Sequence, residues 1–192
     1  MTWAERGRSL DTSNKAEWRA IVHELLTSLP DSRDALLDGI LDQRPMVRAG
    51  CAAALDHTEQ DDIVEIALRR AGHDRDARVR DVALHSLACA RCKPDGCLVD
   101  DSLDLLVDAL LHDPSIRIRR KIAGGLMWAQ HGRTAPLTSA FAKILAEDTD
   151  RVMRHRAATY LASNDVPRDD KRFGDWVGPW QARIVQLEAR EA

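Results

Sequence analysis

Apolar residues recur along this chain at helical spacing, in four segments that align with one another without gaps. Each segment begins with an apolar residue, which is followed by further apolar residues four, five and eight positions later. These offsets fall on one face of an α-helix, so the pattern predicts four equivalent amphipathic helices. The first members of the stripes are Val47, Val79, Ile118 and Met153, and the last members are Leu55, Leu87, Leu126 and Leu161.

The stripes repeat at a period that is typical of a two-helix unit. Their first members lie at positions 47, 79, 118 and 153, which gives intervals of 32, 39 and 35 residues. A shorter apolar pattern precedes each stripe and predicts a first helix in each unit, at residues 33–41, 61–71, 102–111 and 135–146. Each unit can bury its stripe only against its neighbours, so the sequence indicates a stack of helical hairpins.

The expected fold class is therefore all-α: an α-solenoid, or superhelix, of about four helical hairpins with a capping helix at each end. We expect one domain over residues 1–192. It divides into an N-terminal capping helix at 14–31, repeats at 32–163, and a C-terminal capping segment at 164–192. The long middle interval places a cysteine-bearing insertion at 88–101. Aromatic residues make up only 4% of the chain, which suits closely packed helices better than a β-sandwich.

An aspartate and an arginine accompany every stripe. The aspartate stands five positions before the first apolar residue and the arginine directly follows that residue. This element resembles the HEAT repeat, particularly the short bacterial HEAT-like type found in phycobilin lyases, over roughly residues 32–163. The resemblance implies a structural ladder between neighbouring units, in which an aspartate caps a helix and attracts an arginine. Its members would be Asp42, Arg48, Asp74, Arg80, Asp113, Arg119, Asp148 and Arg154.

The insertion carries a cluster of possible metal ligands with the spacing His-x3-Cys-x2-Cys-x4-Cys. Its members are His85, Cys89, Cys92 and Cys97. Three thiolates and an imidazole suit one tetrahedral structural zinc with no open position. Two alternatives stay open: plain thiols at a helix end, or a redox-active CxxC pair. Cys51 occupies a stripe position and is interpreted as core packing.

A set of cations at the starts of the second helices indicates a binding surface. In solenoids with the repeat that this chain resembles, the second helices line a concave groove. Residues not used by the ladder would form a basic band there: Arg78, Arg117, Arg120, Lys121, His155 and Arg156, with Trp128 at the edge. The alternative is that nearby aspartates such as Asp76, Asp81 and Asp150 pair with these cations. The net charge of −3 favours that alternative.

No motif in the chain indicates an enzyme: GxGxxG, P-loop, GxSxG and HExxH patterns are all missing. Catalysis stays open, but we favour a non-enzymatic scaffold that binds the acidic segment of another protein in the groove. One alternative is nucleic-acid binding or repair of the HEAT-like glycosylase type, and another is a bilin lyase-like accessory role. No apolar run reaches the length of a membrane span and no secretory signal is present, so a cytoplasmic location is expected.

The cysteine cluster gives a testable prediction. Protein purified without chelator should carry about one zinc ion per chain, because a closed set of four N and S ligands binds zinc tightly. Elemental analysis with thiol titration checks this. Less than about one-tenth of an equivalent of zinc, together with freely titratable thiols at Cys89, Cys92 and Cys97, would exclude the structural zinc site.

Overall fold

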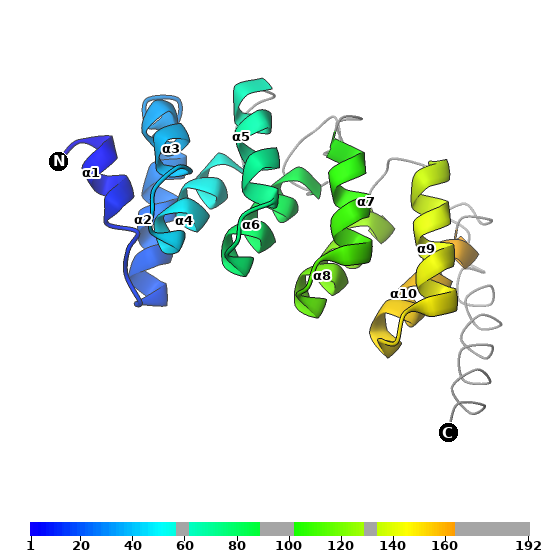
Figure 1. The fold of residues 1–192 in the computed structure, drawn as a ribbon. Coiled ribbons are helices and arrows are strands. Elements are labelled where there is room, and N and C mark those ends of the chain that lie inside the picture. The colour runs from blue at the N-terminus through cyan, green and yellow to red at the C-terminus, as the bar shows by residue number, and fades with distance from the viewer. Residues whose placement is uncertain (57–61, 89–101, 129–133, 164–192) are drawn as a thin grey trace. The chain divides into compact units, whose positions relative to one another are not determined.

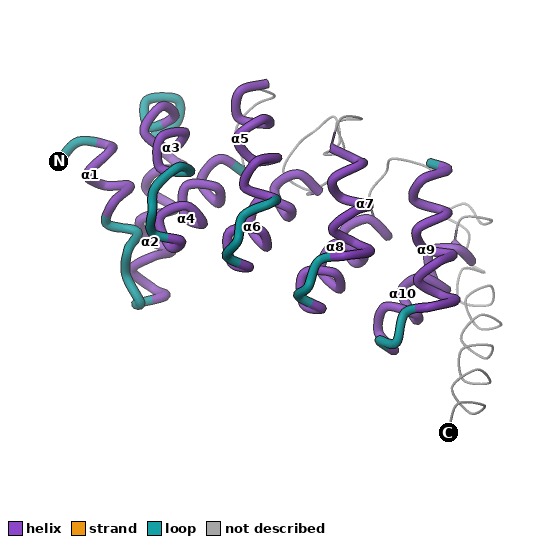
Figure 2. The backbone as a smooth tube through the Cα atoms, viewed as in Figure 1, coloured by secondary structure: helices purple, strands orange, loops and turns teal. Residues whose placement is uncertain are grey.

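The computed structural model describes residues 1–56, 62–88, 102–128 and 134–163. Within these residues it contains ten α-helices and no strand. Figures 1 and 2 show the order of the helices along the chain. Most of the expected insertion and the whole C-terminal capping segment lie outside the described residues. So do Cys89, Cys92 and Cys97, and the side chain of Trp128.

The helices of the repeats lie within two residues of their expected limits. The first helices are α3 (Arg33–Gly39), α5 (Asp62–Gly72), α7 (Leu103–His112) and α9 (Ala135–Glu147). The second helices are α4 (Pro45–Leu55), α6 (Ala77–Ala88), α8 (Ile116–Trp128) and α10 (Arg151–Ser163). Pro45 and Pro136 stand in the first turns of α4 and α9, where a missing amide hydrogen costs nothing. The all-α class expected from the stripes is thus the observed one.

The segment before the first repeat holds two helices where the sequence pattern predicted one. These are α1 (Trp3–Arg8) and α2 (Lys15–Thr27). In the structure α1 packs against α3 and α2 packs against α4, so the segment forms a hairpin beside the first repeat. The Trp18 indole Nε1 donates to the carbonyl oxygen of Met46 at 3.3 Å, which ties α2 to α4. Only six residues long, α1 is too short to show a helical period.

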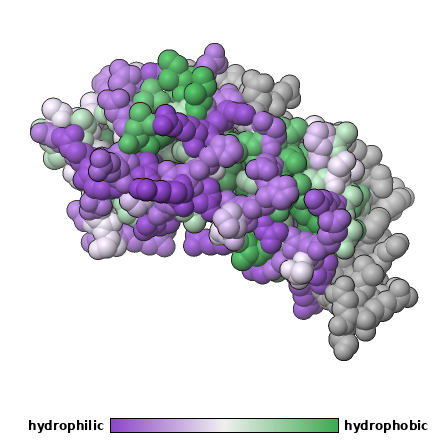
Figure 3. Space-filling model, in the orientation of Figure 1, coloured by the Kyte–Doolittle hydropathy of each residue, from purple (hydrophilic) through white to green (hydrophobic). Residues whose placement is uncertain are grey.

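Contacts divide the chain into two units, Met1–Leu106 and Val107–Ala192. In the first unit α4 and α6 pack side by side, and in the second unit α8 and α10 do the same. The first members of all four stripes are no more than 2% exposed, so the core of each unit sits where the periodicity places it. Phe141 on α9 stacks on Tyr160 on α10 with ring centroids 4.1 Å apart, which joins the two helices of the last hairpin. Polar residues cover most of the face shown in Figure 3.

A close approach between α3 and α4 depends on Gly39. A Cβ atom at this position would lie 2.3 Å from the Cys51 sulfur. Cys51 is fully buried, and burial raises the pKa of its thiol to about 12, so it remains a protonated packing group. The glycine at the end of α3 therefore makes room for the sulfur of α4.

Gly39→Ala should lower the free energy of unfolding by about 1–3 kcal/mol, because the added methyl group overlaps the sulfur. Urea unfolding of the variant measures this loss. The double variant Gly39→Ala/Cys51→Ala should recover part of it, since removing the sulfur removes the clash. Additive effects of the two substitutions would contradict the proposed contact.

Candidate interaction surface

The loop between the two helices of each repeat is closed by its aspartate. In all four loops the carboxylate Oδ1 accepts a hydrogen bond from the backbone amide two residues later, which is an Asx-turn. The pairs are Asp42–Arg44, Asp74–Asp76, Asp113–Ser115 and Asp148–Asp150, each at 2.8 Å. The same residue type thus fixes the same turn four times, directly before each second helix.

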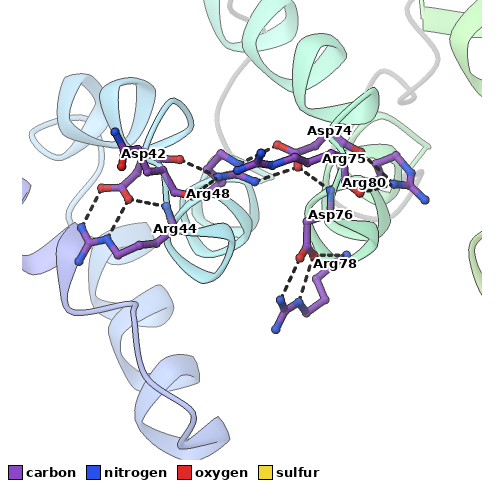
Figure 4. Close-up of polar contacts among 9 residues, drawn as sticks. Asp42, Arg44, Arg48, Asp74, Arg75, Asp76, Arg78 and Arg80 are labelled. Carbon is purple, nitrogen blue, oxygen red and sulfur yellow. Dashed lines mark hydrogen bonds and ion pairs between the residues drawn. The ribbon is translucent and has the colours of Figure 1, made fainter.

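The arginine six residues later returns to the same loop. Nη1 donates to the backbone carbonyl oxygen of that loop's aspartate in three repeats: from Arg48 at 2.7 Å, from Arg80 at 2.9 Å and from Arg154 at 2.8 Å. Figure 4 shows the first two loops. The resemblance to the HEAT repeat implies an arginine paired with aspartate side chains, and this backbone contact is an addition to that role. It holds the loop against the first turn of its own second helix.

Two arginines also reach the aspartate of the following repeat. Nε and Nη2 of Arg48 bind the two carboxylate oxygens of Asp74 at 2.7 and 2.9 Å, a bidentate pair with side chains only 9% and 14% exposed. In the second unit, Arg119 pairs with Asp148. Burial acts to raise the pKa of Asp74, but the Arg48 guanidinium and the Asp76 amide outweigh it and hold that pKa below its usual value.

Two cations of the predicted basic band are held by carboxylates. Arg78 pairs with Asp76 through Nε at 3.1 Å and Nη2 at 2.9 Å, and it lowers the pKa of Asp76 to about 2. Arg120 on α8 pairs with Asp150, which precedes α10, and lowers the pKa of that carboxyl too. At these two positions the surface is therefore mixed in charge rather than uniformly basic.

Three further members of the predicted basic band are exposed on second helices of the second unit. Arg117 and Lys121 are exposed on α8, one turn apart, and His155 is exposed on α10. Arg78 belongs to the first unit, whereas these residues belong to the second. The structure thus brings part of the predicted set together on two packed helices of the second unit.

Arg156 on α10 occupies an unusual position. Its guanidinium lies over Gly124 of α8, where an added Cβ would be 3.1 Å from Nη1. Nη1 is buried and, among the described residues, has no hydrogen-bond partner. An unpaired buried donor costs about 1–3 kcal/mol. The contact joins residues 32 positions apart on different helices, and the sequence gave no signal for it.

The other sequence-derived candidates are only partly placed. His85 lies exposed on α6, and the three cysteines of its proposed cluster fall outside the described residues. Elsewhere in the described ranges no group of three metal-ligating side chains comes together. No helix in the described part of the chain is long and apolar enough to cross a membrane.

Comparison with known proteins shows the fold but no family. No family model matches the chain, and no curated protein sequence matches it significantly. A designed armadillo repeat protein, solved in complex with the peptide (KR)4, is similar with a TM-score of 0.56 and 14% identity. That match covers 97% of this chain and 91% of the other. An engineered protein of known crystal structure is similar with a TM-score of 0.51 and 14% identity. That match covers 95% of this chain and 98% of the other.

The chain thus has the fold of a helical-repeat solenoid. A likeness at this level of identity concerns the architecture alone. It does not separate the HEAT repeat, which the Asp and Arg spacing resembles, from the armadillo repeat.

Asp74→Asn should lower the free energy of unfolding at neutral pH by about 3 kcal/mol, because it leaves the buried Arg48 without its charged partner. The asparagine oxygen can still close the Asx-turn, so the loss reports the ion pair. The pKa of Asp74 is lower in the folded state than in the unfolded chain. Its contribution is therefore present above about pH 4 and disappears as the pH falls further.

Urea unfolding across the acidic range should show the wild type and Asp74→Asn converging in acid. Asp34→Asn is the matched control, because Asp34 is 93% exposed beside Arg33. That substitution should change stability by only a few tenths of a kcal/mol. Equal losses of unfolding free energy from the two substitutions at neutral pH would show that the buried ion pair stabilises the fold no more than an exposed one.

Proposed function

We propose that this protein is a non-enzymatic interaction scaffold that binds a partner protein along the second helices α8 and α10. The observation that carries this proposal is the pair α8 and α10 in the second unit. The two helices pack side by side and present exposed cations, Arg117, Lys121 and His155. A repeat stack leaves an extended face of this kind, on which an extended polypeptide segment can lie.

The chemistry of the described residues supports binding rather than catalysis. The conspicuous charged residues, Asp74 and Arg48 among them, are used to close loops and to join repeats. The similar designed armadillo protein was solved with a basic peptide. Because exposed cations stand on α8 and α10 here, we propose a segment of opposite charge, rich in Asp and Glu, as the ligand of this protein.

The internal pairs favour a protein partner over a nucleic acid. Affinity for a nucleic-acid duplex comes largely from many cations that neutralise successive phosphates. Asp150 already holds Arg120, and Asp76 already holds Arg78. A short acidic segment needs fewer cations and suits a surface of mixed charge, on which the carboxylates also select the position of the ligand.

Reversal of two exposed charges tests the proposal. Once a partner has been recovered by pull-down and purified, Arg117→Glu/Lys121→Glu should weaken its binding about tenfold or more, since both new charges repel an acidic segment. The matched control is Arg70→Glu/Lys143→Glu, which makes the same charge change at exposed positions of the first helices α5 and α9. Titration calorimetry measures both affinities.

The control pair should bind the partner like the wild type. If the second-helix pair binds as tightly as the wild type, or if both pairs lose affinity equally, the partner does not use the second helices and the proposal fails. Circular dichroism of each variant confirms that the fold is retained.

A further inference from the structure

The resting place of Arg156 lies directly over residue 124, a glycine with no side chain to occupy it. The guanidinium covers Gly124 so closely that a Cβ there would lie 3.1 Å from Nη1, 3.4 Å from Cζ and 3.7 Å from Nη2. These distances place the flat end of the arginine on the backbone of α8. Two helices that pack side by side, α8 and α10, thus hold the guanidinium between them.

This resting place provides packing but leaves Nη1 without a hydrogen bond. A guanidinium carries five N–H donors in a planar fork that matches a carboxylate. Nη1 is shut off from water and finds no acceptor. Leaving this position therefore breaks no hydrogen bond at Nη1, and a carboxylate outside would satisfy donors that the resting position does not.

The aspartate that directly precedes α10 is already engaged by another arginine. Asp150, which precedes α10, binds Nε and Nη2 of Arg120 with its two oxygens and also accepts from the amide of Met153 at 2.9 Å. Arg48 and Arg119, in contrast, each have an aspartate of the next repeat. Arg156 differs from these arginines in having a buried donor for which the described chain supplies no acceptor.

We propose that Arg156 turns out of its position over Gly124 and binds a carboxylate of the acidic segment on the partner. The step is a change of side-chain rotamer followed by a bidentate, charge-assisted hydrogen bond. It assigns a specific ligand group to the surface of α8 and α10, and it rests on the proposed function because the carboxylate belongs to the partner.

Substitution of Gly124 separates this mechanism from a purely structural role. A methyl group in Gly124→Ala crowds the resting place, so the flexible end of Arg156 must give by a few tenths of an ångström and the outward conformation that binds becomes relatively more favourable. The variant should bind a poly-glutamate peptide no more weakly than the wild type, and up to about fivefold more tightly, because the cost of leaving is removed. Arg156→Gln should bind the peptide about tenfold or more weakly.

The experiment uses the full chain and follows the guanidinium signal of Arg156 by NMR, assigned by its loss in Arg156→Gln. Poly-glutamate peptide should shift this signal, whereas poly-lysine peptide should not. Lys143→Gln on α9 removes one exposed positive charge from the same unit and should leave peptide affinity unchanged. Thermal unfolding of all variants shows that differences in affinity do not arise from unfolding.

Three results would overturn the inference: weaker peptide binding by Gly124→Ala, unchanged binding by Arg156→Gln, or a signal that responds to duplex DNA but not to poly-glutamate. Failure here is separable from failure of the proposed function. If Arg117→Glu/Lys121→Glu loses the natural partner while poly-glutamate leaves the Arg156 signal unchanged, the scaffold function is supported and the Arg156 site is rejected. If poly-glutamate shifts the signal while the charge-reversed variant still binds the natural partner, the Arg156 site is supported and the proposed function of the surface is rejected.

Discussion

The fold depends on an arginine that serves two loops at once. Arg48 donates to the carbonyl oxygen of Asp42 in its own loop and binds the carboxylate of Asp74 in the next loop. Each contact alone would leave a buried charge with unused donors, which costs free energy where water is largely excluded. Together they satisfy the guanidinium and join one repeat to the next. Asp74 also has two roles, because its carboxylate binds Arg48 and closes the turn of its own loop.

This arrangement explains why the charged residues of the chain contribute less to an open basic groove than their number suggests. Acidic side chains at the loops bind cations both within a repeat, as Asp76 binds Arg78, and between repeats, as Asp150 binds Arg120. The surface of α8 and α10 combines exposed cations with fixed carboxylates. Under the proposed function, such a surface would discriminate among partners by the spacing of charges rather than by total charge.

Arg156 is informative because it departs from this rule. Where Arg48, Arg119 and Arg154 meet carboxylates or loop carbonyls, the guanidinium of Arg156 lies over Gly124. Sequences that fold well are consistent at nearly every position, and departures tend to gather where function requires them. The departure lies on two packed second helices, the same elements that carry Arg117, Lys121 and His155.

The sequence by itself determined the repeat, the helices and the core. The stripes beginning at Val47 and Ile118 are local patterns, and a spacing of three to four residues identifies a buried helix face without knowledge of the neighbours. It also located the loops, because an Asx-turn such as that at Asp113 involves residues two apart. The short helix α1 escaped prediction because six residues hold too little periodic signal.

Only the tertiary structure decided which side chains meet. Asp150 lies thirty positions from Arg120, and either could have found another partner at the crowded loop ends. The contact of Arg156 with Gly124 likewise depends on how closely α10 approaches α8, since a few tenths of an ångström separate a tight contact from a clash. Pairing between helices follows from packing distances, and packing distances follow from all the side chains of both helices together.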